Sequence, residues 1–229
     1  MKVVILAAGM GTRLGTLIPK PLTPLINEKN ILYFQIEKLK KYFSIHDIFI
    51  VVGYKKELIM ESFPNLVFIY NHDYTQNNTG KSLLYALEKL DDDVLWVNGD
   101  VYFDSGVIDL MLKSNYSCCL VDTKKCGEEE IKYTLNKEGN IISLSKTIKN
   151  GIGEALGINL IKKRDLELFR EELRKIGKNE YYEKALENLA RENKIILKPI
   201  NKGSYFCQEI DFPEDLERVK NYIKSKVQK

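Results

Sequence analysis

Short apolar runs alternate with segments of helical spacing along the first half of this 229-residue chain, and no other feature constrains the fold more. Runs short enough for buried strands lie at 3–8, 47–54, 66–71 and 93–100. Segments with helical spacing lie between them, at 31–43, 55–63 and 79–90. This repeat is typical of crossover units between parallel strands. It predicts a doubly wound α/β fold, with a mostly parallel sheet and helices on both faces.

The second half of the sequence is less regular. Strands are expected at 116–123, 131–146 and 153–162, with a hairpin turn at 137–140. Helices are expected at 164–176, 180–192 and 211–226. Because the sequence contains no low-complexity linker and no repeat, we interpret residues 1–229 as a single domain. Within it, about 120–200 is expected to form a small subregion that completes a cleft.

Charge and composition argue against several classes of protein. With 35 basic and 32 acidic residues the formal net charge is +3, far from the imbalance expected of a nucleic-acid-binding protein. No apolar stretch approaches the roughly 20 residues of a membrane span, and the N-terminus lacks the profile of a signal peptide. We expect a cytoplasmic protein without nucleic-acid or membrane partners. The sequence leaves a homo-oligomer open.

The cysteines and histidines do not indicate a metal or catalytic site. His46 and His72 neighbour no Ser or Cys that could form a nucleophilic constellation, so hydrolase chemistry is not favoured. The cysteines lack the paired spacing of a zinc site and are too few for a disulfide scaffold. Reduced thiols are therefore expected at Cys118, Cys119, Cys126 and Cys207.

The first apolar run ends in a glycine-rich, basic segment, "AAGMGTRLGTLIPKPL" (7–22). Ligands of parallel sheets bind beyond the carboxyl ends of the strands, so a ligand is expected here. The glycines allow backbone N–H groups to approach a polyphosphate. Arg13 can hold phosphate oxygens through two hydrogen bonds, and Lys20 adds a compact charge between two prolines. An ordinary turn also contains spaced glycines. A dinucleotide-binding loop fits poorly, because prolines follow where that motif has a helix.

Together these residues resemble the nucleotidyltransferases that join a nucleoside triphosphate to a sugar phosphate or another small phosphorylated compound and release pyrophosphate. The resemblance continues in the family's order through "DIFIVVGY" (47–54), "TGKSLLYAL" (79–87), "VNGDVYF" (97–103), "SLSK" (143–146), "GEALGI" (153–158) and "EIDFPEDLERV" (209–219). It implies the Rossmann-like fold of that family. In length the chain is similar to the cytidylyltransferases that act on small acceptors.

The resemblance implies a charged reaction centre, because attack of an acceptor phosphate on the α-phosphorus brings two anions together. Catalytic roles are implied for Arg13 and Lys20 on the nucleotide phosphates and for Lys146 on the acceptor phosphate. Mg²⁺ is the implied cofactor, held by Asp100 and Asp211, since this hard cation prefers carboxylate and phosphate oxygens. From the residues alone, Asp100 would equally suit a turn and Asp211 a helix N-cap.

The residues implied to bind the nucleotide fall in two segments. The glycine loop would cradle the triphosphate through Leu6, Ala7, Ala8, Gly9, Gly11 and Thr12. The second segment would recognise the base through Gln76, Asn77, Asn78, Thr79, Gly80 and Ser82. Free N–H groups at a helix start and amide side chains suit a pyrimidine edge, so CTP is expected. Each of these residues would also suit a polar loop with an N-cap.

The residues implied to bind the acceptor lie in the second half of the chain. Glu154 and Gly157 are expected to line its pocket, and Tyr181 or Tyr182 could hold a cationic group through the ring face. Adjacent helical residues point about 100° apart, so one of the two tyrosines is expected in the core. Weaker candidates are the acids Glu209 and Asp104 and the aromatic pair Tyr205 and Phe206.

We therefore expect a magnesium-dependent cytidylyltransferase. Its substrates would be CTP, or another nucleoside triphosphate, and a small phosphorylated acceptor such as phosphocholine, a phosphonate, phosphoglutamine or a polyol phosphate. A sugar-1-phosphate guanylyl- or uridylyltransferase would use the same phosphate-binding residues. A non-catalytic nucleotide-binding module would need the glycine loop, but would have no use for two distant carboxylates and a second lysine.

Overall fold

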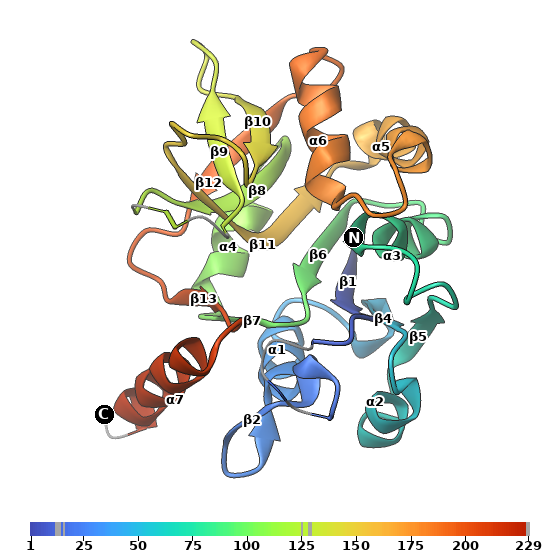
Figure 1. Ribbon diagram of the computed structural model, residues 1–229, viewed down its shortest axis with the longest axis vertical. Helices are drawn as coiled ribbons and strands as arrows, with labels where there is room; N and C mark the ends of the chain where they lie inside the picture. Colours follow the sequence, from blue (N-terminus) through green and yellow to red (C-terminus); the bar gives the residue numbers. More distant parts are fainter. Residues whose placement is uncertain (12–14, 16, 125, 128–129, 228–229) are drawn as a thin grey trace.

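The N-terminal half of the sheet is parallel (Figure 1). The computed structural model describes residues 1–11, 15, 17–124, 126–127 and 130–227. The strands of this half are β1 (Lys2–Ala7), β4 (Ile48–Val52), β5 (Val67–Tyr70) and β6 (Val94–Asn98). β1 pairs in parallel with both β4 and β6, and β4 pairs in parallel with β5. The intervening helices are α1 (Ile31–Leu39), α2 (Lys56–Ser62) and α3 (Thr79–Leu87). The predicted strand-helix repeat is confirmed.

The second half extends the same sheet with mixed directions. Its strands are β8 (Ser117–Asp122), β9 (Lys132–Leu135), β10 (Ile141–Ser145), β11 (Gly153–Ile161) and β12 (Leu197–Asn201). β11 is antiparallel to β6, β8 and β9, whereas β12 is parallel to β8. The helices of this half are α4 (Gly106–Leu112), α5 (Lys163–Lys175) and α6 (Tyr182–Arg191). The described part of the chain thus places nine strands in one sheet, and β11 joins its two halves.

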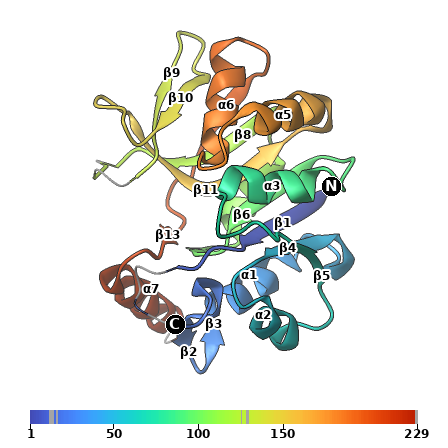
Figure 2. The same ribbon diagram turned by 45° about the vertical axis from the view of Figure 1, so that its right-hand side comes forward.

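Two hydrophobic cores cover the two faces of the sheet. The side chains of β1 alternate between them: Val4 and Leu6 lie in one core, and Val3 and Ile5 lie in the other. The first core is completed by α3, α5 and α6, which gather on one side of the sheet (Figure 2). The second is completed by α1, α2 and α4. This layering confirms the doubly wound α/β fold.

A third cluster attaches the C-terminal helix, α7 (Pro213–Val227), to the lower edge of the molecule in Figure 1. Here β13 (Cys207–Glu209) pairs antiparallel with β7 (Val101–Phe103), and α7 packs on the hairpin of β2 (Pro24–Ile26) and β3 (Lys29–Asn30). The ring of Phe206 stacks on Tyr222 at 3.9 Å. The hydroxyl of Tyr222 donates to Asp104 Oδ2 at 2.5 Å. Short 3-10 turns occur at η2 (Lys20–Leu22) and η3 (Ile45–Asp47).

Several short elements were not expected from the sequence, apart from a strand expected directly before "QEID" (208–211) and containing Tyr205 and Phe206, whereas β13 begins at Cys207. β7 and β13 have three residues each, too few to show a period, and α4 has seven residues and begins with a glycine. β12 contains Pro199, which is tolerated because, among the described residues, this strand pairs with β8 alone.

Two expectations about composition can be compared with the structure. The four cysteines are free, and three of them are buried. In the part of the chain that the structure describes, no helix combines the length and the apolar character needed to cross a membrane.

Candidate active site

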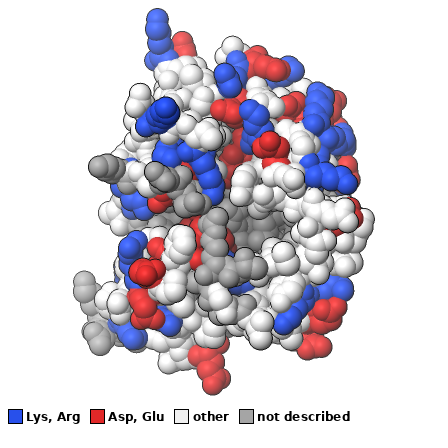
Figure 3. Space-filling view, in the orientation of Figure 1, with Lys and Arg blue, Asp and Glu red and all other residues white. Residues whose placement is uncertain are grey.

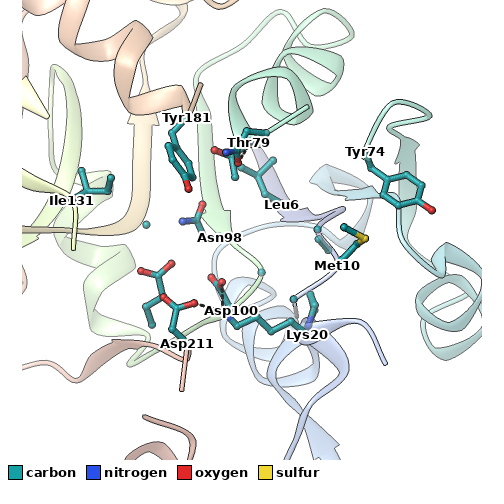
Figure 4. A pocket seen from close by; sticks show the side chains of 18 of the residues that line it. Leu6, Met10, Lys20, Tyr74, Thr79, Asn98, Asp100, Ile131, Tyr181 and Asp211 are labelled. Atoms are coloured by element: carbon teal, nitrogen blue, oxygen red, sulfur yellow. Dashed lines mark hydrogen bonds and ion pairs between the residues drawn. The ribbon is translucent and has the colours of Figure 1, made fainter. Parts of the chain in front are cut away.

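A cavity of about 560 Å³ lies beyond the carboxyl ends of β1 and β6. Figure 3 shows a hollow near the middle of the corresponding face of the molecule. Figure 4 shows side chains from both halves of the sheet pointing into the cavity. Its lining combines the backbone of the glycine loop, the start of α3, the loop after β6 and the start of α6. A cavity in this position agrees with the rule that open α/β sheets bind ligands at the carboxyl edge.

Lys20 lies between two carboxylates at the floor of this cavity. Its Nζ donates to Asp100 Oδ2 at 2.8 Å and to Asp211 Oδ1 at 2.7 Å (Figure 4). We call these three residues the charge cluster. Lys20 begins the 3-10 turn η2 between Pro19 and Pro21. Gly11 has a φ of +60°, and a Cβ at that position would lie 2.6 Å from Lys20 Cβ, so a glycine is required for the loop to pack on the lysine.

Strand register brings the two carboxylates together. Asp100 follows β6, and Asp211 follows β13, whose Glu209 pairs with Val101 of β7. The N–H of Ile210 donates to the carbonyl of Asp100 at 3.0 Å, which fixes the two segments side by side. Residues that are distant in the sequence therefore converge through an antiparallel ladder of only three residues.

Two polar side chains, one buried and one half-buried, hold the loops that carry the carboxylates. Gln35, on α1, donates to the carbonyls of Asn98 and Val101 at 2.8 and 2.7 Å, on either side of Asp100. Asp215 Oδ2 accepts from the N–H groups of Asp211 and Phe212 at 3.2 and 3.0 Å. Asp215 thus satisfies backbone donors at the start of α7, which leaves the Asp211 side chain to bind Lys20.

The charge cluster controls ionisation in the cavity. Lys20 is only 8% exposed, and burial alone would lower its pKa. The charges and hydrogen bonds of Asp100 and Asp211 outweigh this effect and raise the pKa of Lys20 above its usual value. Burial raises the pKa of the neighbouring Glu209 carboxyl, and the charges of Asp100 and Asp211 raise it further. Lys20 is therefore a permanent cation at neutral pH.

The carboxylates of the charge cluster have the chemistry of a divalent-cation site. Among the described residues there is no group of three or more His, Cys, Asp or Glu placed to share a metal ion. Mg²⁺ commonly takes only one or two carboxylates, however, and completes its coordination with water and substrate phosphates. Asp100 Oδ1 is buried and has no hydrogen-bond partner within the described part of the chain. An orphaned carboxylate oxygen beside a second carboxylate fits a hard cation.

The loop before α3 (71–79) forms one side of the cavity. The buried side chain of Asn71 donates to Asn77 Oδ1 at 2.8 Å and to Ser82 Oγ at 2.9 Å. Asn78 caps α3, because its Oδ1 accepts from the N–H of Thr79 at 2.8 Å. The N–H of Asn78 also donates to the carbonyl of Lys178 at 2.8 Å. The loop is therefore anchored both to α3 and to the connection between α5 and α6.

A neighbouring side, which we call the β11 wall, consists of Asn98, Gly157, Tyr181 and Glu183. The hydroxyl of Tyr182 accepts from Asn159 Nδ2 at 3.2 Å and donates to Asn98 Oδ1 at 3.1 Å. Asn98 Nδ2 is then directed toward Gly157, where a Cβ would lie 2.7 Å from it. Gly157 has a φ of +66° and lies within a register shift between β11 and β8. The wall thus requires a glycine for both conformation and space.

The structure brings many of the residues singled out from the sequence to this cavity and places others elsewhere. Those that line it are Leu6, Ala7, Gly9, Gly11, Lys20, Asn77, Asn78, Thr79, Asp100, Lys146, Gly157, Tyr181, Glu209 and Asp211. The described candidates that do not line it are Ala8, Gln76, Gly80, Ser82, Asp104, Glu154, Tyr182, Tyr205 and Phe206. Thr12 and Arg13 lie outside the described residues.

Physical reasons explain the candidates that point elsewhere. Glu154 is buried in an ion pair with Lys124 at 2.9 Å. Tyr182 is the tyrosine of the pair that enters the core, where its ring meets Trp96 edge-on. Gly80 packs closely on the connection between α5 and α6, since a Cβ would lie 2.9 Å from the carbonyl oxygen of Glu180. Asp104 bonds to Tyr222 and so anchors α7.

Sequence reasoning missed two polar residues of the β11 wall. Asn98 is the last residue of β6 and directly precedes Gly99 and Asp100, so its position at a strand end was an available signal. Glu183 follows the tyrosine pair in the first turn of α6, where an acid ordinarily indicates a favourable helix start. Because the helix-start interpretation is sufficient to explain Glu183, the sequence gives no sign that its carboxylate lines the cavity.

Comparison with known proteins places this geometry in context. A model of the MobA-like NTP transferase domain matches residues 3–134. Bifunctional protein GlmU of Methanocaldococcus jannaschii is 29% identical over 236 residues, covering 99% of this chain and 55% of that protein. The D-glycero-alpha-D-manno-heptose 1-phosphate guanylyltransferase of Campylobacter jejuni is 34% identical over 125 residues, covering 52% of this chain and 56% of that protein. In both comparisons the matched residues span about half the length of the relative.

A solved structure shows the same fold over nearly the whole chain. The inositol-1-phosphate CTP transferase from T. maritima superposes with a TM-score of 0.78 at 17% identity. The match covers 97% of this chain and 96% of that one. The fold similarity therefore includes the second half, beyond the residues that match the domain model.

Proposed function

Since the chain belongs to the family of MobA-like NTP transferase domains, we propose that it transfers a cytidylyl group from CTP to a small phosphorylated acceptor and releases pyrophosphate. The observation that carries the proposal is the charge cluster, in which Lys20 lies between Asp100 and Asp211 in the cavity that the glycine loop lines. A module that only bound a nucleotide would have no need for two carboxylates held there against the cost of burial.

The proposed reaction is a displacement at phosphorus. An oxygen of the acceptor phosphate bonds to the α-phosphorus of the nucleotide, while the bond from this phosphorus to the bridging oxygen of the β-phosphate breaks. The electron pair of the broken bond leaves with pyrophosphate. Lys20 neutralises charge that develops on the phosphates, and its raised pKa keeps it protonated throughout. The backbone of Gly9 and Gly11 would cradle the triphosphate, and Lys146 would hold the acceptor phosphate at the other side of the cavity.

Mg²⁺ is the cofactor that we propose, with Asp100 and Asp211 as the residues that would hold it. When bound it would neutralise phosphate charge and favour an in-line arrangement of the reacting oxygens. Asp100 Oδ1, which is buried without a partner among the described residues, supports this assignment. Lys20 Nζ would then remain beside the carboxylates as a second source of positive charge.

The choice of nucleotide rests on the loop before α3. Asn77, Asn78 and Thr79 line the cavity, and their amide and backbone groups are suited to a pyrimidine edge. The solved structure of similar fold is named a CTP transferase, which supports the same choice. The heptose 1-phosphate guanylyltransferase of Campylobacter jejuni supports the alternative, a sugar-1-phosphate guanylyl- or uridylyltransferase. The two candidates share the charge cluster and differ in what the walls recognise.

Pyrophosphate release with magnesium tests the proposal. The four ribonucleoside triphosphates are each combined with phosphocholine, aminoethylphosphonate, inositol phosphate, phosphoglutamine, glycerol phosphate and several sugar 1-phosphates. Turnover confined to CTP with a non-sugar acceptor is the expected result. Turnover with GTP or UTP and a sugar 1-phosphate would favour the alternative. Release that persists after chelation of divalent cations would remove Mg²⁺ from the proposal.

A further inference from the structure

The β11 wall contains a buried carboxylate that the proposed reaction does not use. Glu183 lies in the first turn of α6, lines the cavity and is only 7% exposed. Its Oε2 is buried and has no hydrogen-bond partner in the described part of the chain. Burial raises the pKa of Glu183 to about 7, and the smaller opposing effects of a backbone hydrogen bond, a hydrogen bond with Tyr182 and the charge of Lys146 reduce the shift only in part. A buried acceptor without a donor costs free energy, so a ligand that supplied the donor would bind favourably.

The groups around Glu183 suit a cation better than an anion. The described lining of the cavity contains four carboxylates, from Asp100, Glu183, Glu209 and Asp211, and two lysines, Lys20 and Lys146. Lys20 already binds two of the carboxylates. The Glu183 carboxylate would repel a phosphate group placed next to it. The phosphate of an acceptor is therefore expected at Lys146, and the end of the acceptor remote from the phosphate is expected at Glu183.

Tyr181 adds an aromatic surface at the same place. Tyr181 is the N-cap residue of α6, two positions before Glu183, and the residue is 38% exposed. In Figure 4 the ring points into the cavity toward Asn98. Lys146 Nζ lies 5.5 Å from the centre of this ring, which shows that a cation can approach it. A carboxylate and an aromatic face together form a receptor for an ammonium group.

We propose that Glu183 and Tyr181 form a subsite for a positively charged amine, so that the acceptor is a phosphorylated amine whose ammonium group lies against the β11 wall. The proposal rests on the proposed function for the placement of the acceptor phosphate. An N–H of the ammonium group donates to the unpartnered Oε2 of Glu183, and a quaternary ammonium binds the same carboxylate by charge alone. A neutral hydroxyl would supply one donor but would leave the buried charge unbalanced.

Direct binding to pairs of isosteric probes tests this subsite. Phosphocholine is compared with 3,3-dimethylbutyl phosphate, and aminoethyl phosphate is compared with hydroxyethyl phosphate. Binding is measured by calorimetry on the full chain. The nucleotide is either CTP with Mg²⁺ at low temperature or a non-hydrolysable CTP analogue. The ammonium member of at least one pair should bind about tenfold or more tightly than its neutral partner. Glu183→Gln should abolish this preference without changing the affinity for the CTP analogue.

Glu187→Gln is the matched control. Glu187 is a second buried glutamate one turn later in α6, but it forms an ion pair with Lys184 at 3.0 Å and does not line the described cavity. This variant should keep the preference for the ammonium probes. Retention of the preference by Glu183→Gln, equal or tighter binding of the neutral probes, or no binding of any ammonium probe would each overturn the subsite.

Pyrophosphate release on the same probes separates this inference from the proposed function. Release with neutral acceptors alone would retain the nucleotidyltransferase and overturn the amine subsite. Preferential binding of ammonium probes, lost in Glu183→Gln but without release from any pair, would support the subsite and overturn the proposed reaction.

Discussion

The charge cluster and the β11 wall line one cavity, but their polar groups are satisfied in different ways. In the charge cluster, Lys20 binds both carboxylates, and Gln35 and Asp215 fix the loops that carry them. In the β11 wall, Glu183 has a buried oxygen without a partner in the described chain, and Asn98 directs a donor toward Gly157. In the charge cluster, Asp100 Oδ1 is also buried without a partner in the described chain, and the proposed Mg²⁺ would complete it, whereas the β11 wall would be completed by the acceptor. We infer that the cluster provides chemistry common to many acceptors and the wall selects among them.

Removing a member of the charge cluster should have the largest effect on turnover, and the size of this effect should be the same for every acceptor. Lys20→Ala and Asp100→Ala should each lower turnover at least about 100-fold, as expected when one electrostatic partner of a transition state is lost. Steady-state kinetics with two different acceptors would measure this. Asp47→Asn, whose side chain contacts Lys2 far from the cavity, should retain wild-type rates. A loss of turnover with only one of the acceptors would contradict the inference that the charge cluster serves all acceptors and the β11 wall selects among them.

Gly157→Ala should disturb the wall next most strongly. The added Cβ would require a backbone with a φ of +66° and would lie 2.7 Å from Asn98 Nδ2. We expect a loss of about 1–2 kcal/mol in the free energy of unfolding and a rise of about tenfold in the KM for the acceptor. Denaturant unfolding and kinetics provide the two values. Gly139→Ala, at a φ of +73° in the open β9–β10 turn, is the control for strain without contact.

Tyr182→Phe should have a smaller effect on the same wall. The variant removes the hydroxyl that accepts from Asn159 and donates to Asn98. Asn98 would then be free to reorient, so the KM for the acceptor should rise several-fold while the KM for the nucleotide stays constant. Equal changes in both KM values would indicate a general loss of structure instead. Loss of the buried hydrogen bonds should also cost about 1–2 kcal/mol of stability.

Glu183→Gln should have the smallest effect on turnover with neutral acceptors, and apart from the lost preference for ammonium groups its effect should appear in stability. The pKa of Glu183 is about 7 in the folded protein, against about 4.3 for an unperturbed glutamate. Between these values the folded chain holds a proton that the unfolded chain releases. The free energy of unfolding of the wild type therefore decreases as pH rises through this window.

Glutamine removes that dependence, so the variant should gain stability over the wild type as pH rises, by up to about 3 kcal/mol above pH 7. Urea unfolding at pH 5 and pH 8 measures the difference. Parallel pH profiles for the variant and the wild type would contradict a buried carboxylate at this position. Glu187→Gln should keep the wild-type dependence on pH.

Sequence patterns predicted the region whose geometry is determined locally by parallel strands. Each strand end in the first half delivers the following loop to one edge of the sheet, so Gly11, Lys20 and Asp100 could be expected to meet. The family resemblance added Asp211, which lies beyond the matched residues 3–134. The β13–β7 ladder that brings Asp211 to Asp100 is too short to be seen in a periodic pattern.

The wall was less predictable because tertiary packing determines it. Tyr181 and Tyr182 are equivalent in sequence, and the contact of Tyr182 with Trp96 decides which of them enters the core. That choice turns Glu183 toward the cavity. The predicted position of Glu154 in the acceptor pocket was missed for the same kind of reason. Its carboxylate pairs with Lys124 and does not line the cavity.

The hydrogen bonds from Asn78 to the α5–α6 connection bear on how this protein could be redesigned. Asn78 donates from its backbone to Lys178 and from its side chain to Asn179, only two residues before Tyr181. The loop before α3 and the segment that leads into Tyr181 are therefore linked by direct hydrogen bonds. A graft that exchanged only residues 71–79 with those of a relative would break these bonds. Residues 71–79 and 177–183 form one transplantable unit, and a chimera that altered nucleotide choice would have to carry both.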